Sequence, residues 1–489
     1  MMPVWPLLLA PAVFTGNQSC RPCHTLIFDK YRLTPMARSS GPVADDVPAG
    51  SFRHAASGIG YSVDRSGKVA GRTLSYFVGS GAAGRSYLYA LDGFLFQAPV
   101  TWYSQKGRWD MSPGYEGDRD PAWNRAITPS CLFCHASQVR PIYGTENGYA
   151  EPPILQHGVS CERCHGAGSE HVQGKARLVN PAKLDAARRD SVCSQCHLAG
   201  ESRIEKNGRQ MAAFRAGDLL SDFAAFFVVA GGGSSGVKAT GYVERFAQSR
   251  CKQVSGDKIW CASCHDPHFV PSAGERVAYF RRKCLTCHEQ SHEKSAAAGA
   301  FADCAGCHMP RAQAADGGHG VLTDHAIPRK LSSPPTSRPE TGWKLEPLLG
   351  DGALRETGLA YAEVGVRTRN QRQQNEAVRL LSQIPVDAEV AVRLGDLLQR
   401  QGRMAEAERL YRAAIRLQPP GPLVALVNMG VIHGSRGEYE EAIRFWRLAL
   451  ERSPGQREAT VNLVRVLRAL SRSTEADRLD EAWRRFTAH

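Results

Sequence analysis

The sequence of 489 residues lacks any long hydrophobic run and any excess of acidic residues. Its longest uninterrupted apolar stretch inside the chain extends from Phe223 to Ala230, whereas a membrane-spanning helix needs about 18 apolar residues. An internal transmembrane helix is therefore excluded. The formal net charge is +13, and the hydrophobic and charged fractions of 42% and 22% are those of a globular protein, which excludes disorder throughout the chain. At about 150 residues per domain, the length predicts roughly two to four domains.

Cysteine is almost absent outside a single pattern. Fourteen of the fifteen cysteines form seven C-x-x-C pairs, and each pair is followed at once by histidine. Only Cys251 lies outside this pattern, so we expect a buried thiol there rather than an intermolecular bridge. The motifs, numbered one to seven along the chain, are Cys20, Cys23 and His24; Cys131, Cys134 and His135; Cys161, Cys164 and His165; Cys193, Cys196 and His197; Cys261, Cys264 and His265; Cys284, Cys287 and His288; and Cys304, Cys307 and His308.

C-x-x-C-H is the attachment signature of c-type haem. The two thiols form thioethers with the haem vinyl groups, and the following imidazole ligates the iron. Zinc sites and thioredoxin-like pairs also use C-x-x-C, but neither requires the histidine. We therefore predict seven covalent haem c groups, with the fourteen motif cysteines as attachment sites and the seven motif histidines as iron ligands.

Covalent haem attachment takes place outside the cytoplasmic membrane, so we expect a periplasmic or extracellular, exported protein. Residues 1–16 are a candidate leader. They contain an apolar stretch from Val4 to Phe14 and a potential cleavage site at Ala10-Pro11-Ala12. They lack the basic region that usually begins a signal peptide, so either the leader is truncated or export uses an unusual leader.

The sixth iron ligand must come from elsewhere in the chain. Nine histidines lie outside the motifs, and two of them, His433 and His489, belong to the C-terminal region. Seven haems and seven remaining histidines predict bis-histidine iron throughout. Met36, twelve residues after His24, competes for the first haem and would release His54. The predicted distal histidines are His54, His157, His171, His268, His292, His319 and His325.

The ligand count bears on function. A haem with two protein ligands has no open position for a substrate, so such haems move electrons. No motif is C-x-x-C-K, so the lysine-ligated catalytic haem of ammonia-forming nitrite reductases has no counterpart. A single five-coordinate haem remains compatible with the sequence and would permit catalysis.

The density of motifs predicts close packing of the haems. The motifs lie between Cys20 and His308, about 41 residues for each haem, so the macrocycles must form much of the core. Seven haems also bring fourteen propionates, which nearly balance the charge of +13. The surplus lysine and arginine therefore favour propionate pairing over nucleic-acid binding.

We predict a mainly α protein in three parts. Residues 17–326 form the seven-haem domain, with a β-rich insertion at about 50–115 that shields a haem. In this insertion, Asp92-Gly93 between two apolar runs is typical of a type I′ hairpin. Residues 327–349 are a proline-rich linker, and residues 350–489 form a repeat domain without cysteine or lysine.

The repeat domain has a period of 35 residues. This period is close to the ~34 residues of the tetratricopeptide repeat, in which helix pairs stack and leave a concave surface for a partner. A structural cap or a dimer contact is the alternative role. His433 falls at a helix-packing position, so we interpret it as structural. The recurring residues are Gly395, Ala407, Tyr411, Ala414 and Pro419, then Gly430, Ala442, Trp446, Ala449 and Pro454.

With these motifs in view, the chain resembles a multihaem c-type cytochrome of the cytochrome c-554-like group with a C-terminal tetratricopeptide array. The segments that carry the resemblance are 161–166, 264–268 and 324–328, besides the motifs. In that group a histidine beside a motif often ligates a neighbouring haem, which supports His171, His268 and His325. Members often have histidine where this chain has Met36. The sixth iron ligand of the first haem is therefore left open.

The resemblance implies electron transfer, although relatives of the group include hydroxylamine and nitrite enzymes. Our first hypothesis is an electron carrier whose repeats dock a redox partner protein. The second is an oxidoreductase acting on a small nitrogen or sulfur compound at one five-coordinate haem. The third is an assembly or scaffold protein in which the repeats matter most.

Overall fold

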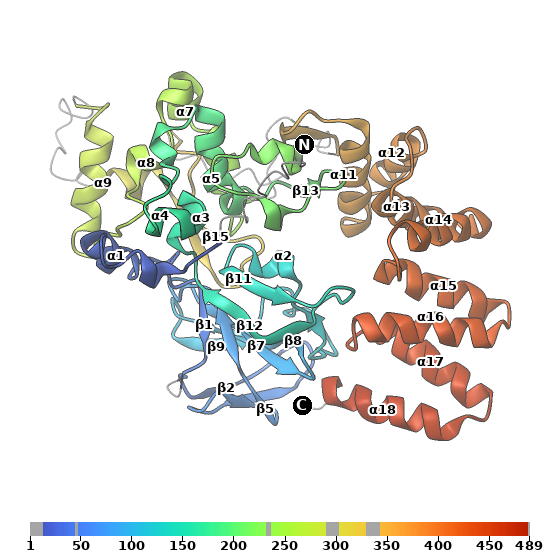
Figure 1. The fold of residues 1–489 in the computed structure, drawn as a ribbon. Coiled ribbons are helices and arrows are strands. Elements are labelled where there is room, and N and C mark those ends of the chain that lie inside the picture. Colours follow the sequence, from blue (N-terminus) through green and yellow to red (C-terminus); the bar gives the residue numbers. More distant parts are fainter. Residues whose placement is uncertain (1–12, 45–46, 231–235, 290–302, 329–342, 488–489) are drawn as a thin grey trace, which may run out of the picture.

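The computed structural model describes residues 13–44, 47–230, 236–289, 303–328 and 343–487. Three sequence predictions fall wholly or mostly on other residues: the candidate leader, the ligand His292 and the linker. No helix in the described part of the chain is long and apolar enough to cross a membrane. The chain divides into a β-rich body, a set of short helices that carry the motifs, and a stack of helix pairs (Figure 1).

The β-rich body is built on an antiparallel sheet in the order β1-β6-β7-β8-β10, with β9 paired to the other part of β8. The predicted hairpin is confirmed, because β7 and β8 are joined by Asp92 and Gly93 at φ values of 52° and 81°. Two small hairpins, β2–β3 and β4–β5, share a hydrophobic core with this sheet. The strands are β1 Ser40–Pro42, β2 Gly50–Arg53, β3 Gly60–Val63, β4 Lys68–Val69, β5 Arg72–Thr73, β6 Tyr76–Val78, β7 Arg85–Leu91, β8 Phe94–Tyr103, β9 Arg108–Met111 and β10 Arg125–Ala126.

The motif-bearing region consists of short helices and three further small sheets. The helices are α1 Thr25–Tyr31, α2 Pro129–Leu132, α3 Cys161–His165, α4 Ser169–Val172, α5 Ala186–His197, α6 Tyr242–Ala247, α7 Arg250–Ser255, α8 Cys261–Cys264, α9 Arg276–Leu285 and α10 Cys304–His308. The strands pair as β11 Ala136–Pro141 with β12 Tyr149–His157, β13 Ser202–Glu205 with β14 Ala224–Val229, and β15 Arg311–Gln313 with β16 Val321–Thr323. Helices α7 to α10 contain no buried side chain in the described structure.

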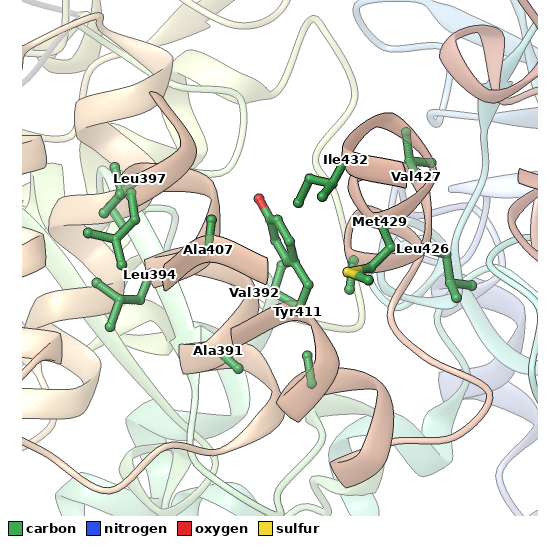
Figure 2. Close-up of a cluster of buried hydrophobic side chains, with 14 of the residues drawn as sticks. Ala391, Val392, Leu394, Leu397, Ala407, Tyr411, Leu426, Val427, Met429 and Ile432 are labelled. Carbon is green, nitrogen blue, oxygen red and sulfur yellow. The ribbon is translucent and has the colours of Figure 1, made fainter. Parts of the chain in front are cut away.

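The C-terminal region is a stack of four helix pairs. It comprises α11 Leu354–Arg367, α12 Gln371–Leu381, α13 Ala388–Arg400, α14 Met404–Leu417, α15 Leu423–Ser435, α16 Tyr439–Arg452, α17 Arg457–Ala469 and α18 Ser473–Thr487. One hydrophobic core extends through the first seven of these helices and reaches Ala476 of the last. Tyr411 lies between Ala407 on one side and Met429 and Ile432 of the next repeat on the other (Figure 2).

The small residues of the repeat have a direct packing reason. A Cβ atom on Gly395 would lie 2.9 Å from Cε1 of Tyr411, so only glycine lets the paired helices approach this closely. His433 is buried and hydrogen-bonded through Nδ1 to Glu438, which agrees with its predicted structural role. The expectation of a mainly helical protein with small sheets and a C-terminal helical repeat is confirmed.

The stack contacts the rest of the molecule at both of its ends. At the first end, residues Leu345–Leu349 form β17, which pairs with β14 as the third strand of its sheet, although the sequence placed them in the linker. At the other end, Phe486 of α18 enters the core of the β-rich body, and its carbonyl accepts a hydrogen bond of 2.8 Å from the Trp123 amide. The C-terminal helix thus returns to the β-rich body beside β5 (Figure 1).

Candidate functional site

Motifs three, four and seven lie wholly within helices, which places the cysteine pair and the histidine of each on one side of a helical turn. The third motif forms the whole of α3, and the seventh forms the whole of α10. Residues i, i+3 and i+4 share one face of a helix, so both sulfurs and the imidazole project together. Asp303 caps α10 by accepting a hydrogen bond of 2.8 Å from the Gly306 amide, and Asp185 caps α5 in the same way.

The motifs meet one another in pairs. The side chains of four cysteine pairs, each drawn from two different motifs, lie in contact, and no disulfide joins any of the fifteen cysteines. These contacts connect motifs one with three, two with four, four with five, and six with seven. The pairs are Cys20 with Cys161, Cys134 with Cys196, Cys193 with Cys261, and Cys284 with Cys304.

Two further pairs of motifs also lie close together. Cys164 of motif three lies near Cys193 and Cys196 of motif four. Cys264 of motif five stands in the same relation to Cys284 of motif six. All seven motifs therefore form one contiguous row, with motif two beside motif four.

A buried carboxylate holds the first motif against the third. Glu162, which is 1% exposed, accepts hydrogen bonds from the backbone amides of Thr15 (2.8 Å), Gly16 (2.9 Å) and Gly168 (2.8 Å). The Cys161 amide donates to Oδ1 of Asn17 at 2.8 Å. The segment before Cys20 is thereby fastened directly to the third motif. The sequence analysis missed Glu162; an acidic residue inside a C-x-x-C-H motif is the signal that would have found it.

Three motif histidines each face a second histidine. The ring centroids of His24 and His171 are 6.4 Å apart, and those of His165 and His268 are 5.9 Å apart. The third pair is His265 with His325 at 6.1 Å. The interplanar angles of the three pairs are 20°, 10° and 28°. Metal–imidazole bonds of about 2.0 Å on both sides of one ion separate the two ring centroids by about 6 Å, so these spacings fit a shared iron.

The second nitrogen of several of these rings is anchored to the backbone. Nδ1 of His165 donates to the Val179 carbonyl at 2.8 Å, Nδ1 of His171 to Ala176 at 3.0 Å, and Nδ1 of His325 to Thr323 at 3.0 Å. His308 of motif seven is held in the same way by Pro328 at 3.0 Å. A donor proton on Nδ1 leaves the lone pair on Nε2 for a metal, so these rings are set in the tautomer that an axial ligand needs.

Burial favours the neutral, metal-binding form of other motif histidines. It lowers the pKa of His135 and His197 below the usual value and lowers the pKa of His265 to about 4. The buried Nδ1 atoms of His135, His157 and His197 have no hydrogen-bond partner among the described residues. Such orphaned donors, together with the thiol pairs and imidazoles, fit haem attachment at these motifs.

Several predicted ligands lie elsewhere. Both ring nitrogens of His54 are hydrogen-bonded, Nδ1 to Ser57 at 2.8 Å and Nε2 to the Glu116 carbonyl at 2.9 Å. Nε2 of His319 is 2.9 Å from Asp110. Among the described residues, neither of these two rings lies opposite a motif histidine, so their assignment as ligands stays a prediction.

Two candidates beside the first motif also remain open. His157 packs against the Tyr76 ring at 5.8 Å and lines a cavity of about 620 Å³ together with Arg21 and Tyr31. Met36 contributes only backbone hydrogen bonds, its carbonyl accepting from Ser39 and Val159. The remaining cysteine, Cys251, is half-buried near Cys264 and Cys284.

Comparison with known proteins yields two family matches. The model described as cytochrome c554 and c-prime matches residues 102–166, which include motifs two and three. The tetratricopeptide repeat model matches residues 386–454. These matches confirm the resemblance to a c-type cytochrome that carries a tetratricopeptide region.

Among curated proteins, the chain is similar to dissimilatory sulfite reductase MccA of Wolinella succinogenes, with 27% identity over 38% of this chain and 28% of that protein. It is also similar to photosystem I assembly protein Ycf3 of Sorghum bicolor, with 42% identity over 12% of this chain and 35% of that protein. The matched regions thus span about a third or less of these relatives.

Among solved structures, the outer cell wall cytochrome OcwA aligns with 90% of this chain and 99% of its own at 13% identity and a TM-score of 0.45. MamA aligns with 26% of this chain and 75% of its own at 18% identity and a TM-score of 0.23.

Proposed function

Taking the chain as a c-type cytochrome with a tetratricopeptide region, we propose that it is an exported electron-transfer protein that carries seven covalent haem c groups. The observation that supports this most strongly is the contiguous row of seven motifs, because electron transfer through a protein needs redox centres in close succession. Bound haem supplies a one-electron ferric/ferrous couple. The chain's own residues determine where these couples sit and how their irons are ligated.

The proposed axial ligands follow from the imidazole pairs. His24 and His171 ligate the first iron, His165 and His268 the third, and His265 and His325 the fifth. The ring spacings of 5.9 to 6.4 Å support this assignment. His171 then takes the place for which Met36 and His54 competed, and the hydrogen bonds of His54 give it a structural role instead.

The proposed order of adjacent centres is one, three, four, five, six and seven, with the second beside the fourth. Sulfur contacts support four of these neighbour relations, and electrostatic proximity supports two. Residues 17–326 form the haem domain in this proposal, and residues 350–489 dock a redox partner protein. We propose a periplasmic or extracellular location because haem c is attached there.

An EPR spectrum of the oxidised, haem-loaded protein tests the ligation. We expect only low-spin ferric signals, because each iron has two strong-field protein ligands. Replacing His171 with alanine should convert one haem to a high-spin form, whereas His54→Ala should leave every signal unchanged. A high-spin signal that appears with His54→Ala and not with His171→Ala would contradict the assignment.

A second candidate is reduction of a small sulfur compound at one open iron. Two observations favour it: the similarity to a dissimilatory sulfite reductase, and the absence, among the described side chains, of an imidazole ring stacked on His135 or His197. Sulfite added anaerobically to the reduced protein would then reoxidise the haems and shift a high-spin band. An unchanged optical spectrum would exclude this activity and leave the carrier function in place.

A further inference from the structure

A buried positive charge lies at the centre of the motif row without a carboxylate partner. Arg163, inside the third motif, is only 8% exposed. Its guanidinium stacks over the Phe133 ring at 4.1 Å, and Nη2 donates to the Phe133 carbonyl at 3.2 Å. These contacts turn the side chain away from its own motif and toward the second.

The contacts of Arg163 neither neutralise its charge nor use most of its hydrogen-bond donors. A guanidinium has five N–H donors, and in the described structure one of them is used. No Asp or Glu among the described residues forms an ion pair with Arg163, and the neighbouring carboxylate of Glu162 is occupied by backbone amides. A buried charge is costly unless it is paired and hydrogen-bonded, so the fold implies an anionic partner that fits beside this group.

The location of the Arg163 charge indicates which anion could pair with it. Arg163 acts electrostatically on both Cys134 and Cys196, whose sulfurs are in contact between motifs two and four. A second guanidinium, that of Arg203 on β13, acts on Cys134. Among the described residues, the side chain of Arg203 forms no ion pair and, unlike that of Arg163, no hydrogen bond. Two arginines without a carboxylate partner therefore lie near the contact between these motifs.

We propose that Arg163, assisted by Arg203, binds a propionate carboxylate of a haem held by the second or fourth motif. This inference rests on the proposed haem content of the chain. A planar guanidinium pairs with a carboxylate through two parallel hydrogen bonds, and the dry surroundings of Arg163 strengthen such a pair. A propionate held in this way stays ionised, and the adjacent cation favours the reduced iron.

The test is a spectroscopic redox titration of the full haem-loaded protein at several pH values between 5 and 8. In Arg163→Gln we expect the midpoint potential of one or two haems to fall while the others keep theirs. The potential of the affected haem should also gain pH dependence, because its propionate loses the cation that keeps its pKa low. Arg163→Lys retains the charge without the paired donors, so its potential should lie between those of Arg163→Gln and the unchanged protein.

The matched control is Arg188→Gln. Arg188 belongs to the same region but is 45% exposed in its side chain and pairs with Asp185 at 2.7 Å, so its removal should leave every potential in place. Potentials of Arg163→Gln that equal those of this control would overturn the proposal. Mass spectrometry of peptides reports haem loading: selective loss of the haem on motif two or four supports the proposal, and general loss from all motifs contradicts it.

The alternative partner for Arg163 is a free anion from solution in place of a haem propionate. If Arg163 bound one, replacing chloride with sulfate at constant ionic strength would shift a midpoint potential in the unchanged protein and not in Arg163→Gln, and the propionate assignment would be wrong. We expect no such shift. Should the unchanged protein carry no haem at all, the proposed function fails; seven attached haems with identical potentials in all variants would refute only this pairing.

Discussion

The motif-bearing helices and the repeat helices differ in how many of their own side chains they bury. Helix α13 of the repeats buries seven residues, including Val390, Leu394 and Leu397, against its neighbours. Helix α9, which leads into motif six, is of similar length and buries none. One region is stabilised by its own apolar side chains, whereas the other offers thiols and imidazoles to a large apolar cofactor. We therefore propose that haem is a structural component of the motif-bearing region as well as its redox group.

Producing the chain without haem attachment should show the largest difference between the two regions. We expect the motif region to lose its folded structure, because helices without buried side chains depend on the cofactor for the whole of a domain's stability, about 5–15 kcal/mol. The repeats should remain helical. Limited proteolysis with mass spectrometry and far-UV circular dichroism would detect this as a surviving fragment that begins near residue 350. Protease resistance of α7 to α10 in that apoprotein would contradict the idea.

A cavity in the repeat core should destabilise the repeats and leave the motif region unchanged. Tyr411 is fully buried, so Tyr411→Ala is expected to lower the free energy of unfolding of the repeats by about 3–5 kcal/mol while the haem spectrum stays unchanged. Tyr411→Phe keeps the ring and loses only the hydroxyl contacts with Gln399 and Asn428, which costs about 0.5–1.5 kcal/mol. Urea unfolding followed by circular dichroism measures both. Equal effects of the two variants would show that ring packing is not the source of stability.

The return of α18 to the β-rich body is one of the contacts that couple the repeat stack to the rest of the molecule. Phe486→Ala removes a ring that contacts Phe96 at a centroid distance of 5.1 Å, so we expect a loss of about 2–3 kcal/mol and two separate thermal transitions. Arg485→Gln removes the exposed pair with Asp92 in the same place and should cost at most about 1 kcal/mol. Differential scanning calorimetry distinguishes the variants. A single unaltered transition in Phe486→Ala would mean that this contact does not couple the regions.

The smallest expected effect concerns acid stability of the repeats. Hydrogen bonds from Arg436 and then Arg412 hold the pKa of Glu408 at about 2. A carboxyl group whose pKa is lower in the folded than in the unfolded protein contributes stability above its ordinary pKa and loses it as the pH falls. We therefore expect about 1 kcal/mol of repeat stability to disappear between about pH 5 and 2, and Glu408→Gln to abolish that part of the pH dependence. Urea titrations across this range provide the measurement, and an unchanged pH profile in the variant would refute it.

Local patterns in the sequence were enough to predict much of this molecule. The Asp92-Gly93 hairpin and the helix pairs of the C-terminal repeat both depend on residues near one another in the chain. The partners of the motif histidines could not be predicted in this way. His171 and His54 are equally plausible by count, and only the folded chain brings one of them opposite His24.

The sequence by itself determined which chemistry each region can carry, because C-x-x-C-H spacing and a 35-residue period are properties of short segments. The tertiary structure alone decided which motifs are neighbours, where the Arg163 charge is buried, and that the stack closes back on the β-rich body through Phe486. The physical reason is that such contacts join residues far apart along the chain. Their partners are selected by the packing of the whole fold rather than by any local preference.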